Sequence, residues 1–120
     1  MPFGEQFDDI YELGIKPVIK GIGFICERAD EIQHNRGILE IVYDRINKAH
    51  IVIGDMTDQN PNVYYEIGYA HALQKEVVLL AQRVEDLPFD LRGYNHIIYA
   101  GKITGLKKEL KRRVEAVYKI

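Results

Sequence analysis

Apolar runs alternate with amphipathic stretches along the chain, and this alternation predicts its fold. Short uninterrupted apolar runs at 22–26, 51–53, 77–80 and 97–99 are typical of strands covered on both faces of a parallel sheet. Between and around them, apolar side chains recur at three- and four-residue spacing over 7–20, 37–49 and 106–117, which predicts helices. We therefore expect an α/β protein, a doubly wound three-layer sandwich with a mostly parallel sheet.

The pattern is interrupted near the N-terminus. Gly14 and Pro17 lie inside the first helical stretch, so we expect that helix to be kinked or broken there. The first strand of such a sheet would fall on residues 1–5, where at most three residues are available for it. Either this first strand is shortened or this edge of the sheet is unusual.

The central stretch, residues 51–80, combines a strand, a polar loop, a helix and a second strand. Asn60 and Pro61 are typical of a helix N-cap and first helical residue. Glu66 then falls in the second turn, where we expect it to face the crevice at the carboxyl ends of the strands, which binds ligands in open α/β sheets. Gly68 and Ala72, one turn apart, are expected to let this helix approach the sheet closely.

Polar side chains gather where the central strand ends. Asp55 follows the strand directly, Asp58, Asn60 and Asn62 occupy the next loop, and Glu66 follows on the helix. Five such residues converging on one crevice are more than a turn requires. Each one also has a structural interpretation, because Asp55 could bond to loop amides, Asn60 could act only as a cap, and Glu66 could be solvated on the outer face.

Residues 55–75, DMTDQNPNVYYEIGYAHALQK, resemble the signature of the nucleoside 2-deoxyribosyltransferase-like superfamily. In that signature an acidic strand end is followed by Glu-x-Gly-x-Ala-x-Ala on a helix, then by Gly-Lys and a strand. Residues 1–5, MPFGE, and 88–92, PFDLR, resemble the bacterial TIR-like branch, often described as nucleotide-binding. The resemblance covers most of the chain and implies one domain over residues 1–120, with a flavodoxin-like (TIR-like) sheet.

The resemblance also implies a reaction. The glutamate at the position of Glu66 acts on the anomeric carbon of a nucleoside or nucleotide, as a nucleophile or as a stabiliser of the oxocarbenium ion. A fixed carboxylate suits this step because positive charge builds on the sugar as the N-glycosidic bond breaks. Nicotinamide leaves NAD from a cationic ring, whereas a purine or pyrimidine needs an acid, for which Asp58 and Asp30 are the candidates.

We therefore expect an N-glycosidase or glycosyltransferase of the NAD hydrolase, deoxyribosyltransferase or deoxynucleotide hydrolase type. Arg28, after the second predicted strand, could meet a phosphate or form a surface salt bridge. The tyrosines near Glu66 could stack on a base or belong to the core. The residues expected to bind substrate beside Glu66 are Phe3, Gly4, Arg28, Asp30, Asp55, Asp58, Asn60, Asn62 and Tyr69.

Two alternatives belong to other functional classes. A non-catalytic TIR-like module would hold a nucleotide for signalling without turning it over. A phosphoacceptor domain would use Asp55 at the strand end, but it also needs acids after the first strand and a hydroxyl after the fourth. Here Glu5 is the only acid near the first strand, and Ala81-Gln82 follows the fourth.

Composition narrows the partners. The chain has 120 residues, a formal net charge of −2 and one cysteine, Cys26, which cannot form an internal disulfide. This balance predicts neither a nucleic-acid nor a membrane partner. The four histidines show no metal-ligand spacing, so we expect no metal and no cofactor. We expect a cytoplasmic protein that acts on a small nucleoside or nucleotide, with NAD among the candidates, as a homo-oligomer in which a neighbour completes the site.

Overall fold

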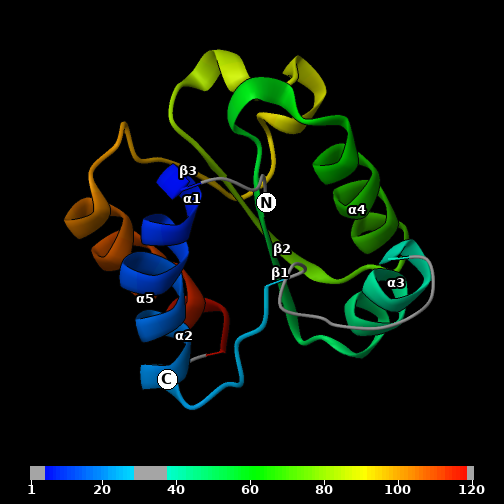
Figure 1. Ribbon diagram of the computed structural model, residues 1–120, viewed down its shortest axis with the longest axis horizontal. Helices are drawn as coiled ribbons and strands as arrows, with labels where there is room; N and C mark the ends of the chain where they lie inside the picture. The colour runs from blue at the N-terminus through cyan, green and yellow to red at the C-terminus, as the bar shows by residue number, and fades with distance from the viewer. Residues whose placement is uncertain (1–4, 29–37, 119–120) are drawn as a thin grey trace.

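A parallel sheet of three strands lies between two layers of helices in the computed structural model, which describes residues 5–28 and 38–118 (Figure 1). The strands are β1 (Ile51–Asp55), β2 (Glu76–Ala81) and β3 (His96–Ile98). Their order is β1-β2-β3, and Val52 pairs with Val77 and Leu80 with Ile97 in parallel register. The α/β class and the parallel sheet are therefore as predicted.

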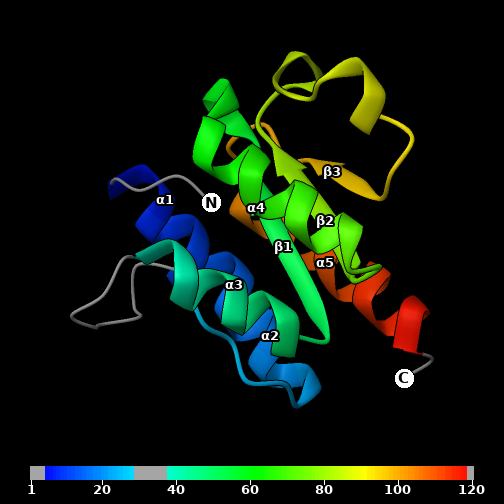
Figure 2. The same cartoon turned by 90° about the vertical axis from the view of Figure 1, so that its right-hand side faces the viewer.

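The helices divide between the two faces of the sheet (Figures 1 and 2). On one face lie α1 (Glu5–Asp9), a π-helical stretch (Ile10–Ile15), α2 (Lys16–Ile22) and α5 (Ile103–Tyr118). On the other lie α3 (Ile38–Lys48) and α4 (Pro61–Ala72). Short 3-10 turns occupy Thr57–Gln59, Val84–Asp86 and Phe89–Leu91. None of the helices in these described ranges is long and apolar enough to cross a membrane.

Residues of β2 alternate between two hydrophobic cores. Val78 and Leu80 pack with α2 and α5, whereas Val77, Leu79 and Ala81 pack with α3 and α4. All five are at most 7% exposed. A continuous apolar run on a strand covered by helices on both faces explains this burial, and it confirms the three-layer sandwich.

The first helical stretch, expected from the sequence to be kinked or broken at Gly14 and Pro17, is not broken there. It widens instead into a π-helical turn, in which the Lys16 N–H bonds to the Tyr11 carbonyl five residues earlier. Pro17 falls in the first turn of α2, where its missing N–H costs little. At Gly14, an added Cβ would lie 3.3 Å from the side chain of Leu106, so glycine allows α5 to pack closely here.

The strand predicted over residues 22–26 is also wrong. Ile22 ends α2, Gly23 follows in the left-handed conformation with φ of 108°, and Phe24–Arg28 forms no strand of the sheet. Within this segment Phe24 and Cys26 are half-buried while Ile25 is 90% exposed. The alternation is strand-like, but a cavity separates the segment from β1. The first strand expected at residues 1–5 lies almost wholly outside the described residues.

Close packing of α4 on the sheet depends on Gly54 and not on Gly68 or Ala72. A Cβ at Gly54 would clash with Ile67 Cδ1 and lie 2.8 Å from its Cγ1. Gly68 and Ala72 are exposed, and nothing lies within 4 Å of a Cβ added at Gly68. The glycine that allows the close approach therefore belongs to the strand.

Candidate functional site

A cavity of about 550 Å³ lies beside the open edge of β1. We call it the edge cavity. One wall is the start of β1, Ile51–Ile53, and the opposite wall is the segment Phe24–Arg28. Side chains of the first helical layer, among them Ile19, and of α3, among them Ile46, close its two faces. Of the predicted site residues that the structure describes, Glu66 and Arg28 line this cavity.

Glu66 reaches the edge cavity because of how α4 begins. The Asn60 side chain accepts a hydrogen bond from the Asn62 N–H at 2.9 Å, and Pro61 is the first helical residue, as predicted. Val63 and Ile67, each 2% exposed, direct the buried face of α4 toward the sheet. Glu66 precedes Ile67 and therefore lies at the border of that face, on the cavity wall.

The environment of the Glu66 carboxylate is unusual for a charged group. The residue is half-buried, and burial raises the pKa of its carboxyl group above the ordinary value of 4.5. Within residues 5–28 and 38–118, no hydrogen bond or ion pair engages the carboxylate. Burial outweighs the opposing charge of the N-terminal amine, which lowers this pKa. A partly dry carboxylate that no described residue pairs with is available to interact with positive charge on a ligand.

Tyr69, a predicted substrate contact, is used in helix packing. Its ring stacks on that of Tyr43 from α3, with ring centroids 4.4 Å apart and planes 24° from parallel. Burial, followed by the charges of Tyr65 and Glu66, raises the pKa of Tyr43, so its phenol stays protonated close to Glu66. Sequence reasoning did not select Tyr43, because its position on another helix gives no sign of this proximity.

Arg28 is 6% exposed and already paired. Its Nη1 donates to Asp8 Oδ1 at 2.6 Å, and its guanidinium lies 5.7 Å from the centre of the Tyr11 ring. The sequence left open a surface salt bridge for Arg28. In the pair that forms, the arginine is buried and Asp8 is exposed. Arg45 adds a second cation to the cavity wall, 3.4 Å from Glu27. Lys48 also lines the cavity and is paired with Asp44, so three basic side chains, each with a carboxylate partner, border it.

The sequence left two roles open for Asp55, a contact to substrate or hydrogen bonds to the loop. In the structure it makes hydrogen bonds of the second kind. Its side chain is fully buried and accepts hydrogen bonds from the Thr57 N–H at 3.0 Å and the Thr57 hydroxyl at 2.6 Å. The Tyr99 hydroxyl donates to its other oxygen at 2.6 Å. Burial raises the pKa of Asp55 and also that of Tyr99. Asp55 does not line the edge cavity, and it ties the ends of β1 and β3 together.

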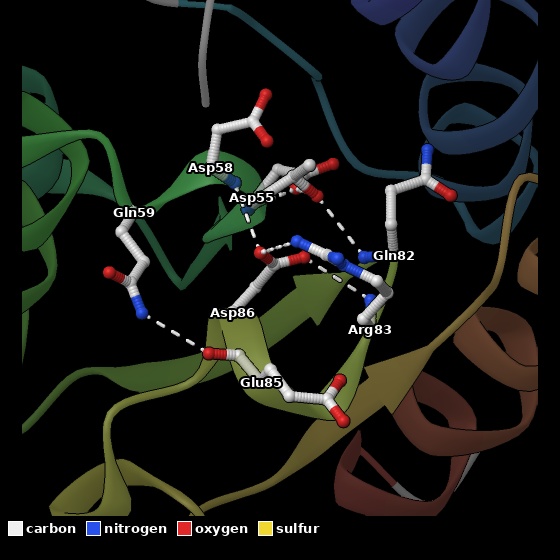
Figure 3. A network of polar contacts seen from close by, with 8 residues as sticks. Asp55, Asp58, Gln59, Gln82, Arg83, Glu85 and Asp86 are labelled. Carbon is white, nitrogen blue, oxygen red and sulfur yellow. Dashed lines mark hydrogen bonds and ion pairs between the residues drawn. The ribbon is translucent and has the colours of Figure 1, made fainter.

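A second buried carboxylate, Asp86, was missed from the sequence (Figure 3). Asp86 is 2% exposed and accepts from the Asp58 N–H at 3.3 Å and the Arg83 N–H at 3.2 Å. The Gln82 N–H donates to the Thr57 hydroxyl at 3.1 Å. These contacts join the loops after β1 and β2. Arg83 caps the turn Val84–Asp86, and Asp86 lies three residues after it, where an acidic side chain often bonds back to the N-cap N–H. This spacing is the sequence signal that could have identified Asp86.

The other predicted contacts that the structure describes do not line the edge cavity. Asp58 is exposed in the loop after β1, with φ of 62°, and Asn62 is exposed on the first turn of α4. Asn60 acts as the cap described above. Phe3, Gly4 and Asp30 lie outside the described residues, so their predicted roles stay predictions.

Comparison with known proteins identifies a shared fold. No known family model matches the sequence, and no curated protein matches it significantly. Among solved structures, the CMP N-glycosidase BcmB from Clostridium botulinum is similar, with a TM-score of 0.70 and 23% sequence identity. The match covers 88% of this chain and 90% of that one. At this identity the likeness shows a common fold, an α/β sandwich with a parallel sheet.

Proposed function

We propose that this protein breaks the N-glycosidic bond of a nucleotide, with Glu66 as the group that meets the positive charge on the sugar. The observation that carries the proposal is the half-buried Glu66 carboxylate on the wall of a 550 Å³ cavity. Ligand pockets commonly measure roughly 300–1,000 Å³, so the edge cavity is large enough for a nucleotide. A carboxylate with a pKa raised by burial, inside such a cavity, is typical of a catalytic group.

The chemistry explains why a carboxylate is needed. As the bond between C1′ and the base nitrogen breaks, its electron pair leaves with the base and positive charge spreads over C1′ and the ring oxygen. Glu66 then either bonds to C1′ or holds the cation until water attacks. Water delivers its oxygen to C1′ and releases a proton, which balances the proton that a neutral base takes up on leaving, and the product is the sugar phosphate. In a transfer reaction, a second base takes the place of water.

Cations on the cavity wall support a nucleotide over an uncharged nucleoside. Arg28 and Arg45 border the edge cavity, and guanidinium groups match phosphate geometry. BcmB, which shares the fold, is named as a CMP N-glycosidase, a nucleotide-cleaving enzyme. We therefore place a nucleoside monophosphate first among substrates.

Of the two acids expected to protonate a leaving base, the one that the structure describes does not line the edge cavity. Asp58 lies in an exposed loop, and Asp30 is outside the described residues. A cationic leaving group such as the nicotinamide of NAD needs no such acid. NAD therefore belongs beside the nucleoside monophosphates among the compounds to be tested.

The test is to incubate the protein with ribo- and deoxynucleoside monophosphates and with NAD, and to measure the released base by chromatography. We expect Glu66→Gln to lower the rate at least about 100-fold, the range for a lost charge-stabilising group. Glu115→Gln, on α5 in the opposite helical layer, is the matched control and should keep full activity. An equally active Glu66→Gln variant would refute the mechanism. Binding in calorimetry without any released base would favour the non-catalytic module instead.

A further inference from the structure

The chain after β1 stays bound to the chain after β2 once the sheet has ended. The last parallel pair of the two strands is Asp55 with Leu80. Beyond that pair, the Met56 N–H still donates to the Leu80 carbonyl at 2.7 Å. One residue further, the Thr57 hydroxyl accepts a hydrogen bond from the Gln82 N–H at 3.1 Å. The contact between the two strands therefore continues into their loops.

Two further bonds extend this contact along the loops (Figure 3). The Asp58 N–H donates to Asp86 Oδ1 at 3.3 Å, and Gln59 Nε2 donates to the Glu85 carbonyl at 3.1 Å. Four consecutive residues of the first loop are thus each bonded to β2 or to the loop that follows it. We call these four bonds the loop clamp.

Asp86 joins the two loops through both of its carboxylate oxygens. Oδ1 accepts from the Asp58 N–H, and Oδ2 accepts from the Arg83 N–H at 3.2 Å. The side chain is 2% exposed, so water does not replace these partners. Asparagine has the same shape but only one acceptor, and its NH2 group would face an N–H donor. A carboxylate at this position is therefore needed to hold both loops at once.

The loop clamp holds the first loop in a strained conformation. Asp58 has φ of 62° and Gln59 has φ of 53°, so two consecutive non-glycine residues are left-handed. Side chains rarely adopt this region, and aspartate tolerates it better than glutamine does. Such residues persist where their surroundings hold them, and they gather at functional sites. The bonds from Asp58 and Gln59 to the second loop are what holds them here.

The clamped loop leads directly into α4. Asn60 follows Gln59, and its carbonyl accepts the first helical hydrogen bonds, from the Val63 N–H at 3.1 Å and the Tyr64 N–H at 3.2 Å. Glu66 lies in the next turn. The apolar contacts of α4 with the sheet are non-directional, whereas hydrogen bonds constrain both distance and angle. The position of the helix start, along and about its axis, therefore depends on the loop clamp.

We propose that Asp86 is a positioning residue, which acts through the loop clamp to fix the start of α4 and thereby the place of the Glu66 carboxylate. The inference rests on the reaction proposed above, in which Glu66 is the catalytic group. Accurate placement matters there, because a shift of about 1 Å in a reacting group can slow a reaction about 100-fold.

The direct test is a titration of the Glu66 carboxyl group, followed by NMR of its carbon in the protein without substrate. We expect Asp86→Asn to move the midpoint down toward 4.5, because a loosened helix start lets water reach the carboxylate. Gln59→Met cuts one bond of the loop clamp without a change of charge and should move it the same way by less. Gln59 is exposed, so this variant carries the test if circular dichroism shows that Asp86→Asn unfolds.

Glu85→Gln is the matched control for charge. It removes the neighbouring negative charge but keeps the carbonyl that takes part in the loop clamp, and its side chain is exposed. We expect it to leave the Glu66 midpoint unchanged. An unchanged midpoint in Gln59→Met and in folded Asp86→Asn would overturn the proposal. An equal shift in Glu85→Gln would also overturn it, since charge alone would then explain the result.

The single-turnover rate of base release distinguishes failure of this proposal from failure of the proposed function. We expect Asp86→Asn to lower the rate at least about tenfold at saturating nucleotide, with binding affinity within a few-fold of the parent. A merely structural role would lower the melting temperature and leave the rate of the folded variant unchanged. Full activity of Glu66→Gln would refute the reaction itself. A slow Glu66→Gln beside a fully active Asp86→Asn would leave the reaction standing and refute the role of Asp86.

Discussion

At the residue scale, two carboxylates from one sequence block have opposite environments. Asp55 is fully buried, yet three hydrogen bonds from Thr57 and Tyr99 satisfy it. Glu66 is only half-buried, yet no described residue bonds to it. A satisfied carboxylate holds structure, and an unsatisfied one on a cavity wall is free to act on a ligand. The contrast assigns Asp55 to the fold and leaves Glu66 as the candidate for chemistry.

The raised pKa of Glu66 has a consequence for stability. The folded protein binds this proton more tightly than the unfolded chain, so ionisation of Glu66 opposes folding. The cost is absent well below pH 4.5, grows as the pH rises toward the folded-state pKa, and is constant above it. We expect Glu66→Gln to have an equal or higher melting temperature at pH 7, and no advantage at low pH. A clear loss of stability at pH 7 would show that the carboxylate is structural.

The same pKa shift sets the pH dependence of the proposed reaction. The carboxylate form is required, so the rate of base release should fall as the pH drops through a midpoint above 4.5. A rate profile measured from pH 4 to 8 gives this midpoint, and Glu115→Gln should share it. A rate that rises on acidification would contradict a role for ionised Glu66.

Tyr99 is expected to matter through Asp55. Tyr99→Phe removes the donor to one buried carboxylate oxygen and leaves that oxygen without its partner. We expect a loss of about 1–3 kcal/mol in the free energy of unfolding, measured by urea denaturation. Tyr65→Phe, at a side chain that is 69% exposed, should change it by less than about 0.5 kcal/mol. Equal effects of the two substitutions would mean that the Asp55 contact contributes nothing.

At the element scale, Gly54 and Gly68 form a matched pair of positions. Gly54→Ala places a methyl group against Ile67 and should destabilise the protein by about 1–3 kcal/mol, since α4 must move away from β1. Gly68→Ala meets nothing within 4 Å and should stabilise α4 by about 0.5–1 kcal/mol. Thermal unfolding of the two variants checks both signs. A neutral Gly54→Ala would show that α4 does not depend on this close approach.

Local patterns were enough to predict most elements. The apolar runs predicted β1, β2 and β3, and Asn60-Pro61 predicted the start of α4 to the residue. Phe24–Arg28 has a strand-like pattern but is not a strand, because a strand also needs a neighbour to pair with. The N-terminal helix was predicted to be kinked or broken at Gly14 and Pro17, but it continues there through a π-helical turn, and contact with Leu106 on α5 gives Gly14 a packing role. Both features depend on contacts that are distant in sequence.

At the scale of the whole molecule, the two helical layers extend past the sheet on the side of β1 (Figure 2). Side chains from both layers border the edge cavity, and Glu66 and Arg28, which are far apart in the chain, both line it. The sequence resemblance indicated Glu66, but no pattern could indicate the Arg28–Asp8 pair, the Tyr43–Tyr69 stack or the cavity itself. These depend on how the layers are placed in space.

The most direct test of the central claim is the single-turnover rate of base release from a nucleotide substrate by the parent protein and by Glu66→Gln. We predict that the variant still binds the nucleotide within a few-fold of the parent affinity, and that its rate falls at least about 100-fold. Unchanged rates at saturating protein would contradict the claim that the Glu66 carboxylate, on the wall of the edge cavity, stabilises the charge on the sugar.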